Sequence, residues 1–239
     1  MSRTCSNTSW GAEVPLGRLK QIPIISYPAE HSTTFENINS DTGRIQIVHT
    51  VAPQLDYHFI PEPWRQAPIV HLAPVAQEVE PSLVRRFPNS LVGVTPQGWL
   101  RAWDTQGHVR MTEWPEAVFT LQQSGAAVLS INDVRNDESR IEEMASASRI
   151  LVITEGAAGS RVYWNGDVRL FRPPQEVEVD STGAGDIFAA AFFTRLYLTH
   201  DPWESTRFAN QIAATSVTRR GLDAIPTTEE IQEYLIEVI

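Results

Sequence analysis

Apolar residues gather into short runs with few polar positions along the middle of the chain. Four such runs occupy residues 69–73, 91–95, 126–131 and 149–154. Strands that are covered by helices on both faces of a parallel sheet show this pattern. Two stretches of higher polarity, 80–87 and 137–144, lie between these runs and are helix candidates. Strands that alternate with helices predict an α/β fold with a mostly parallel central sheet.

Alternating apolar and polar positions dominate the N-terminal part instead. They predict three strands at residues 22–27, 33–38 and 44–49. The last two flank the sequence Asn-Ser-Asp-Thr-Gly at 39–43, which is suited to a hairpin turn. A second hairpin is predicted at 161–171, around Asn165 and Gly166.

The C-terminal third predicts a strand, a small-residue turn and three helices. Alternating residues 176–179 lead into the turn, and an apolar run at 187–193 leads out of it. The predicted helices run from Asp186 to about Thr199, from Pro202 to about Arg219, and from Thr228 to the end.

The turn before the first of these helices is the strongest candidate for chemistry. Gly183, Ala184 and Gly185 leave almost no side chain there, so a ligand can approach the backbone closely. The first N–H groups of a helix have no internal partner, and the helix dipole adds positive potential. A phosphate suits such a turn, and Asp186 would then take a proton from an attacking hydroxyl. The alternative is structural: Asp180 or Ser181 caps the helix, and Asp186 only favours its positive end.

Composition limits the classes of partner. The 239 residues carry a net charge of −10, which argues against a nucleic acid or an anionic membrane as partner. Cys5 is the only cysteine, so an internal disulfide is impossible. The N-terminus shows no apolar signal core, and no run is long enough to span a membrane. We therefore expect a cytoplasmic protein that forms a single domain over residues 1–239.

The nine residues from Asp180 to Phe188 (Asp-Ser-Thr-Gly-Ala-Gly-Asp-Ile-Phe) resemble the C-terminal signature of the ribokinase (PfkB) family of carbohydrate and nucleoside kinases. The resemblance implies a ribokinase-like three-layer α/β fold with a small β lid. It implies an ATP-dependent transfer of phosphate to a hydroxymethyl group of a sugar or nucleoside-like molecule. Asp186 would be the catalytic base, and Gly183, Ala184 and Gly185 would form the anion hole. Asp180 falls where members of the family often bind a monovalent cation, usually potassium.

Two further segments match the family in the same order. Thr154, Gly156 and Gly159 resemble its Thr-x-Gly-x-x-Gly segment, which implies contacts with the nucleotide. Asn210 lies in a stretch that resembles the helix beside the adenine. The alternative for Asn210 is a polar residue on a solvated helix face.

One polar position departs from the family. Asn132 matches the start of the Asn-x-x-Glu segment that positions magnesium through water, but Arg135 occupies the place of the glutamate. Asp133 or Glu138 would substitute, or magnesium would be held mainly by ATP.

The front of the chain departs further. The family begins with a strand, an acidic sugar-binding residue and a Gly-Gly motif, whereas here the lid-like segment already starts near residue 22 and spans about 22–50. Either the sequence is part of a longer chain or the protein is a shortened variant. We expect residues 125–239 to bind nucleotide and catalyse, and exposed apolar surface to favour a homodimer. The alternatives are a nucleotide-binding protein with little or no kinase activity, and a structural module.

Overall fold

The computed structural model describes residues 4–8, 22–40 and 43–236. Its main sheet has six strands in the order β12-β11-β10-β9-β6-β5. These are β5 (Ile69–Leu72), β6 (Leu91–Val94), β9 (Ala126–Ser130), β10 (Ile150–Thr154), β11 (Ser160–Trp164) and β12 (Asp167–Phe171). The first four are parallel, and β11 and β12 add an antiparallel hairpin. The predicted α/β class with a mostly parallel sheet is confirmed.

The α-helices in the described residues are α2 (Ala117–Gln123), α3 (Glu138–Ala147), α4 (Ala184–Thr199), α5 (Pro202–Ser216) and α6 (Thr228–Ile236). The last three match the predicted helices within a few residues. The stretch at 80–87 forms only a short 3₁₀ helix, Pro81–Arg85. Helix α2 was not predicted, because it has only seven residues.

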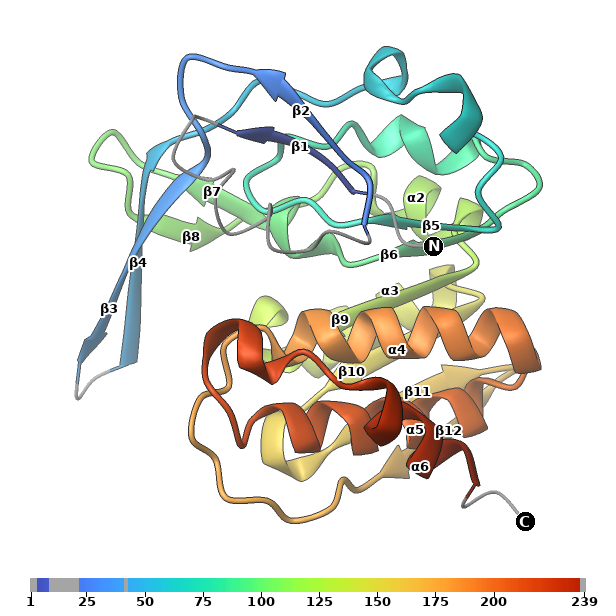
Figure 1. Ribbon diagram of the computed structural model, residues 1–239. Coiled ribbons are helices and arrows are strands. Elements are labelled where there is room, and N and C mark those ends of the chain that lie inside the picture. Colours follow the sequence, from blue (N-terminus) through green and yellow to red (C-terminus); the bar gives the residue numbers. More distant parts are fainter. Residues whose placement is uncertain (1–3, 9–21, 41–42, 237–239) are drawn as a thin grey trace.

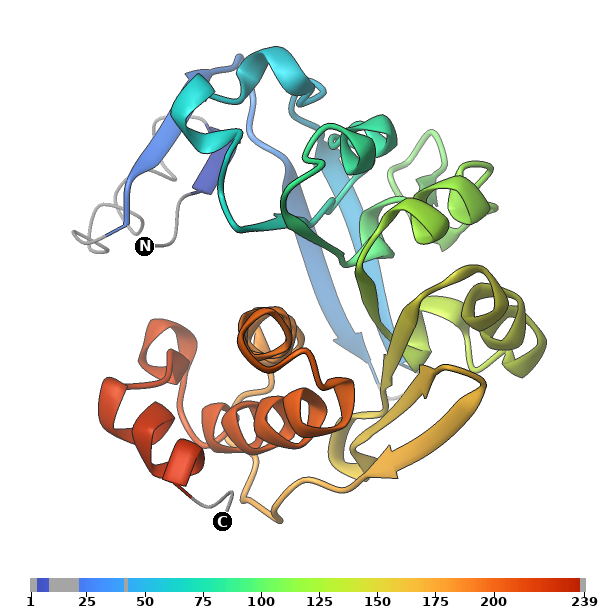
Figure 2. The ribbon, with the colours of Figure 1, turned by 90° about the vertical axis from the view of Figure 1, so that its right-hand side faces the viewer.

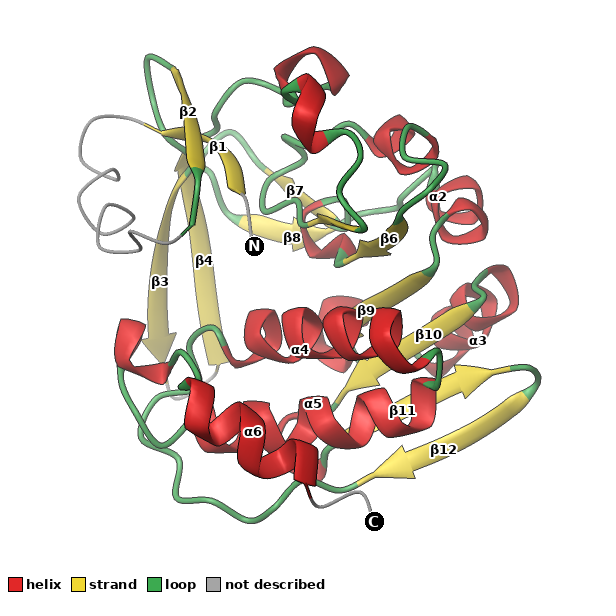
Figure 3. Cartoon of the chain, turned by 45° about the vertical axis from the view of Figure 1, so that its right-hand side comes forward, coloured by secondary structure: helices red, strands yellow, loops and turns green. Residues whose placement is uncertain are grey.

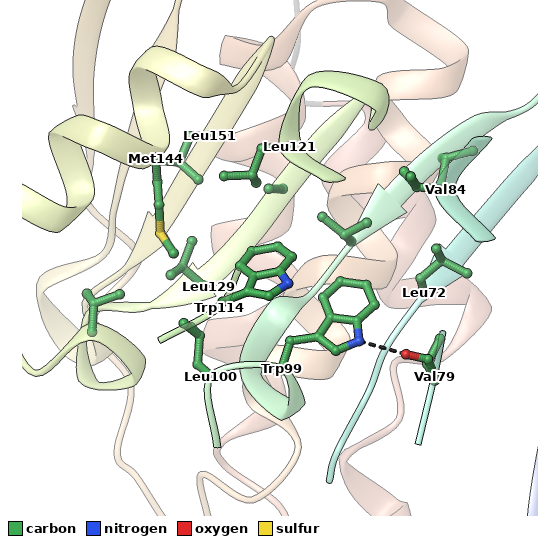
Figure 4. Packing of buried hydrophobic residues seen from close by; sticks show 14 of the residues in the cluster. Leu72, Val79, Val84, Trp99, Leu100, Trp114, Leu121, Leu129, Met144 and Leu151 are labelled. Carbon is green, nitrogen blue, oxygen red and sulfur yellow. Dashed lines mark hydrogen bonds between the residues drawn. The ribbon is translucent and has the colours of Figure 1, made fainter. Parts of the chain in front are cut away.

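Two cores, one on each face of the sheet, give three layers (Figure 2). Phe192 and Phe193 of α4 pack on one face against Val152. The other face is covered by α2, α3 and the loop residues between β6 and α2. There Trp99 stacks on Trp114 with ring centroids 5.1 Å apart, and its indole N–H donates to the carbonyl of Val79 over 2.7 Å (Figure 4).

Three two-stranded sheets lie beside the main sheet. β1 (Thr4–Thr8) pairs with β2 (Ile24–Pro28), β3 (Thr34–Ser40) with β4 (Gly43–Thr50), and β7 (Arg101–Trp103) with β8 (Val109–Met111). The β3–β4 hairpin is the predicted one, whereas β7–β8 was not predicted. Val48 of β4 donates to the carbonyl of Gly107 over 2.8 Å, so the two hairpins lie side by side (Figures 1 and 3).

Strand β5 is the last strand of the main sheet at one edge. Helix α4, which packs against β5, is apolar on nearly all sides, and its residues Tyr197 and Leu198 are exposed. A helix of this kind usually lies inside a larger packed unit. Among the described residues, none of the helices is both long and apolar enough to cross a membrane.

Candidate functional site

A hollow of about 1100 Å³ lies where β9 and β10 end and α4 begins. Ligands in sheets of this class bind at the C-terminal ends of the parallel strands. The hollow brings together seven of the predicted site residues: Asn132, Thr154, Gly156, Gly159, Ala184, Gly185 and Asn210. Asp180, Gly183 and Asp186 are not part of its lining. Asp180 and Gly183 belong to the turn before α4, and Asp186 belongs to its first turn. Ala184 and Gly185 of the same helix do line the hollow.

Helix α4 begins without a side-chain cap. Its N-cap residue is Gly183, which is left-handed with φ of 83°, and no side chain accepts a hydrogen bond from the first turn. The alternative in which Asp180 or Ser181 caps this helix is therefore wrong. A residue with a Cβ atom at position 183 would be strained, because L-residues other than glycine rarely adopt this conformation.

Because this helix has no side-chain cap, some backbone N–H groups at its start remain without an acceptor. The N–H of Ala184 donates to the carbonyl of Ser181 over 3.2 Å. Within the part of the chain that the structure describes, the N–H groups of Gly183, Gly185 and Asp186 have no hydrogen-bond acceptor. Unpaired N–H groups at the positive end of a 16-residue helix form a site for an anion.

Asp186 lies in the first turn of α4, and its side chain is in contact with solvent. No hydrogen bond or ion pair to its carboxylate exists among the described residues. The surrounding protein still removes part of its hydration shell, and this burial raises the pKa of Asp186 above its ordinary value. An unpaired carboxylate with a raised pKa is a proton acceptor rather than an anchor.

Asp180 has the opposite environment. Its Oδ1 accepts from the Thr182 N–H over 2.9 Å, and its Oδ2 accepts from the Gly221 N–H over 3.4 Å. The hydrogen bonds from Thr182 lower the pKa of Asp180, so it remains a carboxylate. The same loop is fixed to the end of α5, because the N–H groups of Val179 and Asp180 both donate to the carbonyl of Val217.

The turn after β10 combines a hydroxyl with two left-handed glycines. Thr154 is half-buried, and its Oγ1 lies 3.5 Å from the carbonyl of Leu129. Gly156 has a φ of 59° and open space around it. At Gly159 the φ is 103°, and a Cβ atom would lie 2.0 Å from the carbonyl oxygen of Phe171. Gly159 is therefore required by packing as well as by backbone conformation.

Asn210 is buried on α5, with 5% of its surface exposed. Its Nδ2 donates to Ser160 Oγ over 2.9 Å and approaches the carbonyl oxygen of Phe171 at 3.4 Å. The alternative of a solvated helix face is wrong for this residue. Asn210 connects α5 to β11 and β12 while part of its surface lines the hollow.

The segment after β9 is the short 3₁₀ helix η5 (Ile131–Val134). Asn132 is exposed and lines the hollow. Both carboxylate oxygens of Asp133 are occupied, one by the Ser130 N–H and one by Gln97 Nε2, each at 2.9 Å.

Glu138, the other acid considered for magnesium, is also occupied. It forms a two-pronged ion pair with Arg161 at 2.8 and 2.9 Å, which lowers the pKa of Glu138. It does not line the hollow. Neither acid offers a free carboxylate in place of the glutamate that Arg135 replaces.

Sequence reasoning missed the hairpin wall of the hollow. This wall includes Arg101 and Arg110 of β7 and β8, and Gln46 of β4. Strands of three residues carry almost no periodic signal. The available signal was the turn residues Asp104 and Gly107: Asp104 Oδ1 accepts backbone hydrogen bonds within the turn, and Gly107 is left-handed.

A second hollow, of about 900 Å³, lies at the opposite edge of the sheet, where β6, β9 and β10 begin. Its lining is mainly apolar and includes Leu91, Ile150, Trp164 and Tyr197. None of the predicted site residues lines it. We therefore assign the chemistry to the first hollow.

The sequence profile of the pfkB family carbohydrate kinases matches residues 104–229, just over half of the chain. A ribokinase of Bacillus subtilis is 42% identical over 96 residues, which are 39% of this chain and 32% of the ribokinase. A fructokinase of Escherichia coli is 27% identical over 226 residues, which are 84% of this chain and 72% of that protein. This chain thus matches about a third of the length of the ribokinase.

Solved structures share the fold. A pyrophosphate-dependent kinase in the ribokinase family, in complex with sulfate, superposes with a TM-score of 0.81 at 15% identity. The superposition covers 96% of this chain and 85% of that chain. The three-layer ribokinase-like fold is therefore confirmed for the described residues.

Proposed function

Because the chain belongs to the pfkB family of carbohydrate kinases, we propose that it transfers the γ-phosphoryl group of ATP to a hydroxymethyl group of a sugar or nucleoside-like acceptor. One observation carries this proposal. At the start of α4, unpaired N–H groups at a positive helix end lie next to a carboxylate that has no partner in the described part of the chain and whose pKa is raised. A carboxylate in the first turn favours the positive end of the helix, but it repels any anion that binds there. Phosphoryl transfer to a hydroxyl uses both the anion site and the carboxylate.

In the proposed reaction the oxygen of the substrate hydroxyl bonds to the γ-phosphorus of ATP, and the bond from that phosphorus to ADP breaks. Asp186 accepts the proton that the hydroxyl loses. The raised pKa of Asp186 makes this proton transfer more favourable. The N–H groups of Gly183 and Gly185 would donate to the oxygens of the transferring group. They need no reorganisation, because the left-handed Gly183 already fixes the turn.

The nucleotide would occupy the end of the hollow lined by β10 and α5. Thr154 and Gly156 offer a hydroxyl and backbone N–H groups there, and Gly156 leaves open space for phosphate oxygens. Ala213 and Ala214 present a small, flat wall of α5 on which a base can lie. Asn210 would lie near the base and hold this wall to β11.

Magnesium fits this hollow mainly as a companion of ATP. In the described ranges no three histidine, cysteine, aspartate or glutamate side chains gather into a metal site. Asn132, exposed in the lining, is the residue that would face the ion through water. When bound, magnesium would neutralise charge on the phosphates.

Asp180 fits a monovalent cation such as potassium. Its lowered pKa keeps it charged, and the hydrogen bond from the Gly221 N–H brings the loop at 221 beside it. A cation there would stabilise the loop that leads into α4.

The test is ADP release with Mg-ATP and potassium across a panel of sugars, polyols and nucleosides. Release that depends on the acceptor in the wild type and falls in Asp186→Asn supports the proposal. Equal release by both proteins would overturn the role of Asp186. Since position 186 is exposed, the substitution leaves the fold intact, which circular dichroism can verify.

The second candidate is a kinase-fold nucleotide binder with little or no turnover. Arg135 in the hollow, together with the occupied carboxylate of Asp133, favours it. This candidate predicts that a non-hydrolysable ATP analogue binds with normal affinity while no acceptor on the panel releases ADP.

We also propose that the protein forms a homodimer in the cytoplasm. The position of β5 as the last described strand at one edge of the sheet, and the exposed Tyr197 and Leu198 of α4, support self-association. Light scattering would test it, and a dimer that becomes monomeric in Leu198→Glu would assign the interface to α4.

A further inference from the structure

Three arginines line one end of the hollow, namely Arg101, Arg110 and Arg135. Arg101 and Arg110 come from the β7–β8 hairpin, and Arg135 directly follows η5. The opposite end is the one lined by α5. If the nucleotide occupies that end, the arginine end faces the acceptor.

Arg101 is held in place by its neighbours. Its Nη1 donates to the carbonyl of Val75 over 2.9 Å, and its guanidinium lies 5.3 Å from the ring centroid of Phe35. Nη2 approaches Gln46 Oε1, another residue of the lining, at 3.4 Å. Arg101 is therefore a fixed positive charge at the wall of the hollow.

Arg110 and Arg135 are exposed, and neither forms an ion pair with a described carboxylate. Some arginines elsewhere in the described chain do form ion pairs, such as Arg161 with Glu138 and Arg195 with Glu204. In a protein with a net charge of −10, two unpaired guanidinium groups on the same hollow point to an anionic ligand.

Three acidic side chains also line the hollow. One is Asp133, whose two oxygens accept from the neutral donors Ser130 and Gln97. The others are Glu176 and Glu178, which belong to the segment between β12 and α4.

We propose that the arginine end binds an anionic group of the acceptor, a phosphate or a carboxylate that the sugar or polyol already carries. The inference rests on the proposed function and narrows its substrate class to anionic acceptors. Guanidinium groups recognise both anions through paired N–H donors. The anion would hold the acceptor by one end and leave a hydroxyl at the other end free to approach Asp186.

The experiment measures binding by calorimetry, with the full chain and with Mg-ADP present. The probes are matched pairs: ribose with ribose 5-phosphate, fructose with fructose 1-phosphate and fructose 6-phosphate, and glucose with gluconate. We expect at least one charged probe to bind about tenfold or more tightly than its neutral partner, and to weaken with rising salt. The phosphate and carboxylate pairs distinguish the two anions. No preference for any charged probe would overturn the inference.

The variants are Arg110→Gln and Arg135→Asn, alone and combined. Asparagine suits position 135 because the φ there is 54°, a conformation that asparagine tolerates. We expect each substitution to weaken the charged probe about tenfold and to leave the neutral partner unchanged. Arg207→Ala is the matched control, since Arg207 is exposed on α5 and does not line the hollow.

A parallel titration with a non-hydrolysable ATP analogue completes the test. If the double variant binds the analogue more weakly and the charged probe as before, the arginines serve the donor phosphates, and the inference is overturned. Selective loss of the charged probe would support it even if no acceptor were turned over. Failure of the proposed kinase function is thus distinguishable from failure of the acceptor site.

Discussion

The two walls of the hollow are built in different ways. The wall of β10 and α4 presents backbone N–H groups, which left-handed glycines such as Gly156 and Gly183 turn outwards. The hairpin wall presents long side chains, Arg101 and Arg110, on strands of three residues. Backbone groups fix one geometry for a group common to all substrates of a class, whereas side chains can change without disturbing the fold. We infer that the first wall serves the phosphoryl donor and the second selects the acceptor.

Among the substitutions that test this difference between the two walls, we expect Asp186→Asn to have the largest effect. Replacing Asp186 with asparagine removes the proton acceptor and leaves the N–H groups of α4 in place. We expect turnover to fall by about 10²–10⁴-fold, with little change in the affinity for ATP. Steady-state kinetics with the best acceptor measure both values, and a change in ATP affinity alone would contradict the assignment.

Gly159→Ala tests how rigidly the backbone wall is built. Its new Cβ atom would lie 2.0 Å from the carbonyl oxygen of Phe171, at a φ of 103°. We expect a loss of about 2–4 kcal/mol in the free energy of unfolding, measured by urea denaturation. Gly156→Ala is the control, because it shares the left-handed backbone but has open space around it. It should cost only about 1–2 kcal/mol.

Asn210→Ala tests whether the α5 side of this wall depends on one buried amide. The substitution leaves Ser160 Oγ and the carbonyl of Phe171 without their donor. We expect a loss of about 1–3 kcal/mol in stability, together with weaker binding of an ATP analogue. A stability loss with normal nucleotide affinity would limit Asn210 to a structural role.

The pH dependence should separate the two carboxylates at the start of α4, Asp186 and Asp180. Asp186 must be ionised to accept a proton, and its raised pKa means that kcat/KM falls with decreasing pH sooner than for an ordinary aspartate. Asp180 has a lowered pKa, so its contribution to stability is present above the ordinary aspartate pKa and is lost as the pH falls through the lowered value. Activity should thus fall at a higher pH than thermal stability does. Coincident losses would contradict this order.

The backbone wall could be predicted from the sequence, whereas only the turn of the hairpin wall left a signal there, in Asp104 and Gly107. Continuous apolar runs predicted β9 and β10, and the small residues at 183–185 predicted a tight turn before the helix. The β7–β8 hairpin is held by tertiary contacts with β4, such as the bond from Val48 to Gly107, which no local pattern encodes.

The burial and the hydrogen-bond partners of single residues could also not be predicted from the sequence. The burial of Asn210 follows from how α5 rests on β11 and β12, and its helix has polar residues on several sides. The carboxylate of Asp133 was a possible magnesium ligand until Gln97, 36 residues away, proved to occupy it. The segment at 80–87 looked helical, but Pro81 and Pro88 allow only one short 3₁₀ turn between them.

The bond between Asp180 and the Gly221 N–H joins two loops that are 41 residues apart in sequence. One loop leads into α4, and the other leads towards α6 at the C-terminal end of the described chain. A change in the length or charge of the distant loop would therefore shift the helix start without touching the hollow. If α4 carries the proposed chemistry, we expect changes in the loop at 221–227 to alter turnover more than acceptor affinity.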